Sequence, residues 1–227
     1  MTTFQFIALL LTVIWLVIVV VRFRRSTLAL MIGLVALALF TIAALALGKV
    51  TLMQLGMGPV HSWLLMLVLT LVWLGLMLAY SPLADRLATR WFAKPPTLEA
   101  FGAIQQSVTK LIAGILAAWL LGGILEELIA RGIVLMSVDS LLAGWLPVPV
   151  AAALAICIAA IGAGLMHFYQ GPRAVVIITQ LSILFGILFV ISGYNLWAVV
   201  ICHGLYDTIA FIRFATKKSR YSNLEGE

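Results

Sequence analysis

Charged residues are scarce in this chain. Asp, Glu, Lys and Arg make up 10% of the 227 residues, whereas an average soluble domain carries about 25%. Hydrophobic residues make up 64%, and the mean hydropathy is +1.20. A water-soluble globular fold does not accommodate this composition, which instead indicates a protein that spans a membrane.

Cysteine is also rare, and the placement of the two residues excludes common cysteine chemistry. Cys157 and Cys202 lie inside apolar segments without a CxxC or CxxxH partner, so we expect two small buried hydrophobic side chains. An HExxH motif is absent, and no Ser or Cys nucleophile is evident beside a base. The net charge of +6 does not indicate nucleic-acid binding, because the basic residues stand at the ends of apolar segments.

Long apolar runs make up most of the sequence. Several reach the ~20 residues that a helix needs to cross a ~30 Å hydrocarbon core. We predict an all-α, polytopic membrane bundle of about seven transmembrane helices, near residues 4–21, 28–47, 62–80, 111–136, 148–170, 174–192 and 196–215. Its largest contact is then with the lipid bilayer, and the expected location is the cell membrane, as a multi-pass protein of the bacterial inner-membrane type.

Basic residues predict the orientation of this bundle. If Arg22, Arg24 and Arg25 lie in the cytoplasm, most other basic loop residues fall on the same side and only Lys49 falls outside. We therefore predict an N-terminus outside and a C-terminus inside. The first apolar segment has no Lys or Arg before it, so we expect a retained membrane helix rather than a cleaved signal.

Three regions are predicted along the chain. Residues 1–98 hold the first helices and a cytoplasmic connector, residues 99–216 hold a membrane core that contains the polar clusters, and residues 217–227 form a cytoplasmic tail. Apolar residues between Leu83 and Trp91 share one helical face, which predicts a short helix on the membrane surface. Such a helix is either a simple anchor or a shelf that contacts lipid or substrate.

Polar clusters interrupt the later apolar segments, and the first contains two neighbouring glutamates. An ionisable group at the bilayer centre costs roughly 2.5–3.5 kcal/mol, so it usually faces the protein interior and has a function. Glu126 and Glu127 point about 100° apart on a helix, whereas Glu127 and Arg131 are four residues apart and share a face. We expect Glu127 to pair with Arg131 and Glu126 to keep a free carboxylate suited to a general base. The alternative is an ion-pair cluster that only links helices.

Two further clusters contain histidine. His167 stands near the end of the fifth predicted helix, in the segment GLMHFYQG. His203 and Asp207 are four residues apart and project on one side of the seventh helix, where the carboxylate can accept a hydrogen bond from the imidazole or help to bind a metal. Taken singly, a histidine at a helix end and an isolated His–Asp pair are common features.

Together the clusters resemble the motifs of the CAAX prenyl protease and bacteriocin-processing family, called CPBP or Abi. The resemblance spans residues 118–215 and rests on Glu-Glu-x-x-x-Arg at residues 126–131, on His167, and on His203-x-x-x-Asp207. The family's second motif usually has Phe four residues before the histidine, and residue 163 here is Ala.

The resemblance implies an intramembrane endopeptidase that hydrolyses a membrane-associated peptide or protein. Glu126 and His167 would activate a water, and His203 and Asp207 would stabilise the oxyanion or help to hold the nucleophile. We expect no cofactor, and the alternative is zinc held by His167, His203 and Asp207. The other candidate functions are a non-catalytic member of the family, acting in bacteriocin immunity or as a scaffold, and a transporter with a proton relay.

In a bundle of straight helices, two of these residues would lie at different depths in the membrane. At a rise of 1.5 Å per residue, Glu126 lies near mid-membrane and His167 near the cytoplasmic end. Tilting or a re-entrant segment must close this gap. Residues 132–147 contain two glycines and a proline, so two possibilities stay open for them: a re-entrant segment that brings the two levels together, or a simple crossing that leaves them apart.

Overall fold

The computed structural model describes residues 2–23 and 26–224, with side chains described up to residue 216. Regular structure in this part of the chain is helical throughout. The α-helices are α1 (Thr3–Arg22), α2 (Thr27–Ala46), α3 (Trp63–Thr89), α4 (Val108–Ala118), α5 (Met136–Leu142), α6 (Val148–Met166), α7 (Pro172–Ile191) and α8 (Leu196–Leu224). Short 3₁₀ segments are η1 (Met53–Leu55), η2 (Glu99–Gln105) and η5 (Phe168–Gln170), and π-helical segments are η3 (Trp119–Glu126) and η4 (Leu128–Leu135).

Seven helical segments in the described residues are long and apolar enough to cross a membrane, which confirms the predicted all-α bundle. The fourth span is one run of 35 residues, Val108–Leu142, that joins α4, η3, η4 and α5. The orientation across the bilayer stays a prediction. Arg24 and Arg25, used for that prediction, and the last three residues of the predicted tail lie outside the described residues.

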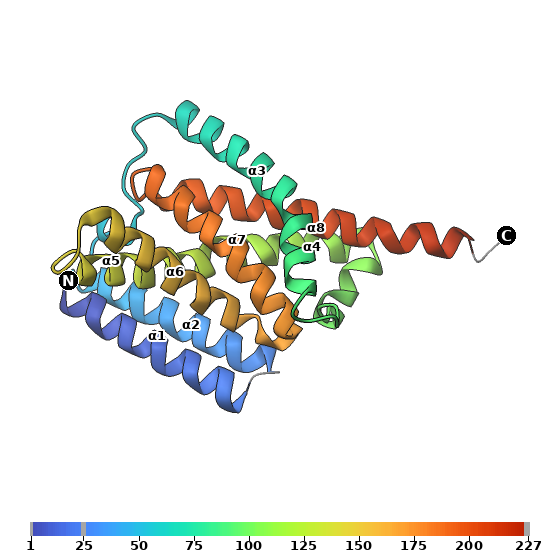
Figure 1. The fold of residues 1–227 in the computed structure, drawn as a ribbon, viewed down its shortest axis with the longest axis horizontal. Coiled ribbons are helices and arrows are strands. Elements are labelled where there is room, and N and C mark those ends of the chain that lie inside the picture. Colours follow the sequence, from blue (N-terminus) through green and yellow to red (C-terminus); the bar gives the residue numbers. More distant parts are fainter. Residues whose placement is uncertain (1, 24–25, 225–227) are drawn as a thin grey trace.

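The helices pack as neighbouring pairs (Figure 1). α1 and α2 run side by side along one edge, α6 and α7 form the middle, and α3 and α8 lie on the opposite edge. Gly164 sets the spacing of α6 and α7, because a Cβ added there would stand 2.7 Å from the Val175 carbonyl oxygen and 2.0 Å from Thr179 Oγ1. Small residues allow membrane helices to approach this closely.

The connector after the third span differs from the prediction. Residues 83–89 continue α3 rather than forming a separate surface helix, and Pro82 lies inside α3. Figure 1 shows the helix changing direction towards its C-terminal end. Ala84 and Ala88 are fully buried, and Asp85 forms an ion pair with Arg173 at 2.7 Å. These contacts hold the end of α3 against α7.

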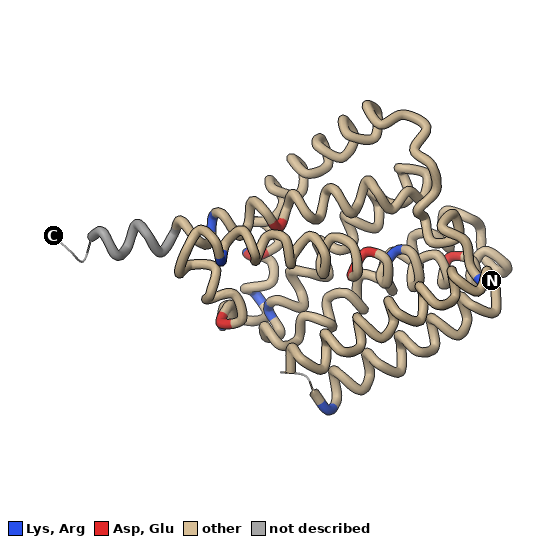
Figure 2. The backbone as a smooth tube through the Cα atoms, turned by 180° about the vertical axis from the view of Figure 1, so that it is seen from behind, with Lys and Arg blue, Asp and Glu red and all other residues tan. Residues whose placement is uncertain are grey.

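The outer surface of the bundle is apolar. Leu64 and Leu65 on α3 are 72% and 70% exposed, as expected for side chains that face lipid. Figure 2 shows few charged positions within the length of the bundle. The expectation for cysteine was wrong at one position, since Cys202 is buried but Cys157 is exposed. Cys157 is not among the residues that α6 buries, and its side chain is exposed.

Candidate active site

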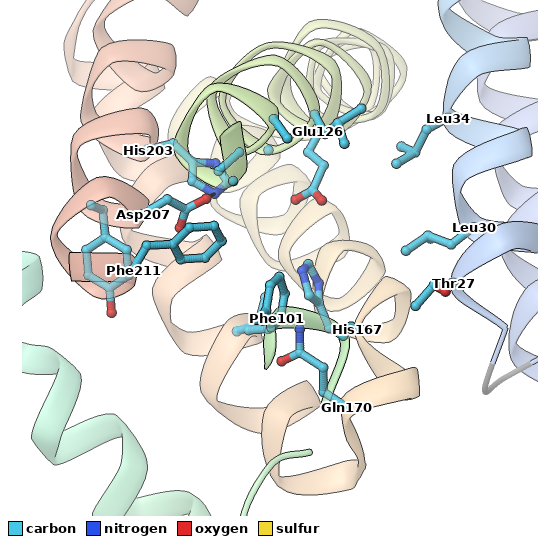
Figure 3. Close-up of a pocket in the computed structure, with 18 of the residues that line it drawn as sticks. Thr27, Leu30, Leu34, Phe101, Glu126, His167, Gln170, His203, Asp207 and Phe211 are labelled. Carbon is cyan, nitrogen blue, oxygen red and sulfur yellow. Dashed lines mark ion pairs between the residues drawn. The ribbon is translucent and has the colours of Figure 1, made fainter. Parts of the chain in front are cut away.

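A cavity of about 830 Å³ opens into the core of the bundle. It is lined by residues from α2, η2, the Val108–Leu142 span, α6, η5, α7 and α8. All six residues selected from the sequence line it, namely Glu126, Glu127, Arg131, His167, His203 and Asp207. Figure 3 shows four of them around one space, with α2 across from Glu126. Most of the remaining lining is apolar.

Glycines in the π-helical segment η3 allow α8 to come close. A Cβ added at Gly122 would stand 3.0 Å from Asp207 Oδ2 and 3.4 Å from His203 Nε2, and one at Gly123 would stand 3.4 Å from the Val200 carbonyl oxygen. π-Helical turns are rare and often occur at functional sites, where they change the direction of side chains. Here they occur on both sides of Glu127, so the two glutamates lie on a locally widened helix.

Glu127 is fully buried and forms the ion pair with Arg131 that their spacing predicts. Arg131 Nη1 lies 3.0 Å from each carboxylate oxygen of Glu127. His203 Nδ1 also lies 2.6 Å from Glu127 Oε1. This carboxylate therefore links two helical segments from different parts of the sequence, as the structural interpretation of the cluster expects.

The second guanidinium nitrogen of Arg131 binds α7. Nη2 donates to the Ser182 carbonyl oxygen at 2.7 Å and to Ser182 Oγ at 2.6 Å. Arg131 lies over the ring of Phe185 at 5.5 Å, and this ring stacks on His203 with centroids 4.8 Å apart. Sequence reasoning missed Ser182 and Phe185, because nothing local distinguishes them from the other residues of an apolar helix.

His203 lies between two carboxylates. Its Nδ1 faces Glu127 at 2.6 Å, and its Nε2 lies 3.5 Å from Asp207 Oδ2. Two carboxylate oxygens cannot both be satisfied by one neutral imidazole, which has a single N–H. Both contacts are favourable when the His203–Asp207 pair carries an additional proton, on either the ring or the carboxyl group.

Glu126 differs from its neighbour in having a free carboxylate. The side chain is half-buried and lines the cavity. Within the described part of the chain, no hydrogen bond or ion pair engages it. In Figure 3 its carboxylate points into the open space, towards the side of the cavity that holds His167. The two neighbouring glutamates therefore have different environments, one paired and one open to the cavity.

His167 ends α6, and a backbone contact fixes its tautomer. Nδ1 lies 2.9 Å from the Ala163 carbonyl oxygen. A carbonyl oxygen can only accept, so Nδ1 carries the proton and Nε2 keeps its lone pair. The ring lines the cavity, where Figure 3 shows it below Glu126. Ala163, which stands where the resembled family has Phe, is itself buried and also lines the cavity.

Of the two possibilities for residues 132–147, the structure shows a helix that continues through residues 132–142. Gly132 allows this helix to pack against the Leu55 carbonyl oxygen, from which an added Cβ would stand 2.8 Å away. Near the end of this helix Asp139 accepts a hydrogen bond from the Tyr194 hydroxyl at 3.0 Å. Burial, followed by this hydrogen bond and the nearby carboxylate, raises the pKa of Tyr194 to about 12. Gly132 itself allows close packing and does not form a turn.

A tyrosine and a glutamine that follow His167 in the sequence complete this end of the cavity. Tyr169 and Gln170 both line it, and the Gln170 side-chain amide donates to the Tyr169 hydroxyl at 2.9 Å. Burial raises the pKa of Tyr169 to about 12; the Gln170 hydrogen bond opposes the rise, and the charges of Glu126 and Asp207 add to it. Both residues stand in the segment GLMHFYQG, so their closeness to His167 in sequence was the available signal.

The contacts of His203 compete with a role as a zinc ligand. Both ring nitrogens of His203 face carboxylates, at 2.6 Å and 3.5 Å, and one of these belongs to the buried Glu127–Arg131 pair. Across the described residues, no group of three His, Cys, Asp or Glu side chains is arranged to hold a metal ion.

Part of the chain is similar to a known protein family. Residues 108–209 match the family model described as type II CAAX prenyl endopeptidase Rce1-like. The match confirms the resemblance found in the sequence motifs, and the matched segment contains all six of the cavity residues selected there. No curated protein and no solved structure matches the chain.

Proposed function

We propose that this multi-pass membrane protein is an endopeptidase that hydrolyses a peptide bond of a membrane-associated peptide or protein. The observation that carries the proposal is the pairing of two free proton acceptors in one cavity. The Glu126 carboxylate and His167 Nε2 both line it, and neither has a hydrogen-bond partner within the described residues. A water held by these two acceptors is in the position that general-base catalysis requires.

Each proton in the proposed reaction has a defined route. Glu126 takes a proton from the water while His167 Nε2 orients it, and the water oxygen forms a bond to the peptide carbonyl carbon. The carbonyl oxygen becomes anionic and receives a hydrogen bond from the protonated His203–Asp207 pair. The C–N bond then breaks, and Glu126 returns its proton to the leaving amine. One water is consumed, and a carboxylic acid and an amine result.

Glu127 and Arg131 have a different role in this proposal. Their pair is buried and holds His203 Nδ1, so it orients the imidazole rather than touching the substrate. Such a supporting contact fixes which face of the ring is presented to the cavity. Ser182 extends this support to α7 through Arg131 Nη2.

The apolar part of the cavity fits an apolar substrate segment. Leu30 and Leu34 of α2 line one side, and Phe101 and Phe211 line another. Figure 3 shows these side chains around the same opening as Glu126 and His167. The matched family's description names a prenylated CAAX end, and this lining would hold a prenyl group or a hydrophobic peptide segment. We place the enzyme in the cell membrane, of the bacterial inner-membrane type.

The test is cleavage of a defined peptide pool by the purified full chain in detergent micelles. The pool contains membrane-associated peptides and matched C-terminal peptides with and without a prenyl group, and mass spectrometry detects the products. Wild type is compared with Glu126→Gln and with Glu99→Gln, an exposed glutamate outside the cavity lining. We expect cleavage by wild type and Glu99→Gln, and a loss of at least about 100-fold in Glu126→Gln.

The same cleavage assay with a chelator present tests whether the reaction needs a metal ion. We expect cleavage to persist with a chelator present, because the proposed chemistry uses no metal. Loss of activity that added zinc restores would contradict the glutamate mechanism. Binding of pool peptides without cleavage, by a wild type that melts cooperatively, would instead support a non-catalytic peptide-binding protein.

A further inference from the structure

A tyrosine beside His167 has no role in the reaction described above. Tyr169 lies in η5, two residues after His167, and lines the cavity. The rings of the two residues stack, with centroids 6.0 Å apart and an interplanar angle of 28°. Both therefore belong to the same wall, immediately next to the proposed water.

The hydrogen bonding of Tyr169 leaves its proton free. The hydroxyl oxygen accepts from Gln170 Nε2 at 2.9 Å, and no acceptor for its own O–H group is found among the described residues. Tyr206, the other tyrosine that lines the cavity, donates its proton to Ser81 Oγ at 2.9 Å. Of these two hydroxyls, only that of Tyr169 can donate to a molecule in the cavity without breaking a contact.

Gln170 prepares this hydroxyl for donation. The residue is 8% exposed, so its side chain is enclosed, and its backbone carbonyl accepts from the Thr97 N–H at 2.9 Å, which holds the backbone in place. A hydroxyl that accepts a hydrogen bond becomes a stronger donor through polarisation. Tyr169, Glu126 and Asp207 line the same cavity, so the hydroxyl shares this space with the proposed base and the proposed oxyanion donor.

We propose that the Tyr169 hydroxyl donates a hydrogen bond to the peptide carbonyl oxygen as this oxygen becomes anionic, and so acts as a catalytic residue beside the His203–Asp207 pair. Gln170 is then a positioning residue that orients the hydroxyl. No proton is transferred in this role, so the proton balance of the reaction is unchanged. The inference rests on the proposed peptidase function.

Tyr169→Phe removes the hydroxyl and keeps the ring that stacks on His167. Losing one oxyanion donor typically lowers kcat by about 10²–10³-fold, and we expect a fall of about 100-fold with KM and Tm unchanged. The probe is the peptide of the defined pool that wild type cleaves fastest. Tyr80→Phe is the matched control, because it removes a hydroxyl bonded to Gln180 Oε1 at 2.9 Å, outside the cavity lining. It should leave kcat unchanged.

Gln170→Glu gives a second test that keeps Tyr169 intact. A carboxylate at this position would take the phenolic proton as a hydrogen bond, so kcat should fall with the tyrosine still present. Unchanged kcat in both variants, or a higher KM with normal kcat, would overturn the inference. Glu126→Gln separates the two proposals: if it is inactive and Tyr169→Phe is fully active, only the role of Tyr169 fails. If wild type cleaves nothing, the proposed function fails and this inference fails with it.

Discussion

Arg131→Met tests how the buried ion pair supports the site. The arginine side chain is 3% exposed and its Glu127 partner is fully buried, so the substitution leaves a carboxylate without its cation in the protein interior. It also removes the donor to the Ser182 carbonyl and hydroxyl oxygens. Met fills much of the volume of the arginine stem, so the main loss is electrostatic.

The expected cost follows from this geometry. Removing one partner of a buried pair typically destabilises a protein by about 3–5 kcal/mol, because the remaining charge is uncompensated. Combining Arg131→Met with Glu127→Gln removes both charges, and the neutral amide can still accept from His203. We therefore expect the double variant to be more stable than Arg131→Met by at least about 1 kcal/mol, since replacing a whole pair costs much less than breaking it.

The assay is equilibrium unfolding in mixed detergent micelles, followed by circular dichroism. Arg173→Met is the matched control, because its partner Asp85 is 47% exposed and such pairs contribute about 1 kcal/mol or less. Two results would refute the reasoning. One is an Arg131→Met protein within about 1 kcal/mol of wild type, and the other is a double variant no more stable than this single one.

Three further predictions concern other parts of the structure. His167→Gln removes the free Nε2 lone pair and should lower kcat by about 10²–10⁴-fold with an unchanged Tm, whereas retained cleavage would exclude its proposed role. Gly164→Ala should destabilise the protein by about 1–3 kcal/mol, because its Cβ would stand 2.7 Å from a carbonyl oxygen of α7. Gly162→Ala, whose Cβ would have an ordinary 3.8 Å contact, should be tolerated in the same unfolding assay. The raised pKa of Tyr194, about 12 against 10.0, predicts that wild type loses stability relative to Tyr194→Phe as the pH rises from 10 to 12. Parallel curves for the two proteins over that range would contradict a native contact with Asp139.

The helical framework was predictable from the sequence because hydropathy is a local property. Each of the seven predicted spans is present, and the first two agree with the structure to within one residue at each end. Errors arose where packing overrides local signals. Residues 83–89 continue α3, whose Ala84 and Ala88 are buried, and Gly132 lies inside a continuous helix that packs against the Leu55 carbonyl oxygen.

The candidate site was predictable in part. The spacing of Glu127 and Arg131 predicted their ion pair, since residues four apart share a helix face. The same rule placed His203 and Asp207 on one side of α8. It could not show that His203 reaches Glu127, because 76 residues separate them and only the close approach of α8 to the glycines of η3 brings them together.

The sequence by itself determined that this protein is an all-helical membrane bundle and which ionisable residues are available for chemistry, because composition, hydropathy and motif spacing are properties of the chain. The tertiary structure alone decided that those residues line one cavity, that Glu127 is buried while Glu126 is free, and that Tyr169 and Ser182 join them. Those outcomes depend on how the helices pack against one another. This packing is set by contacts between residues that are distant in sequence, and such contacts leave no local pattern in the chain.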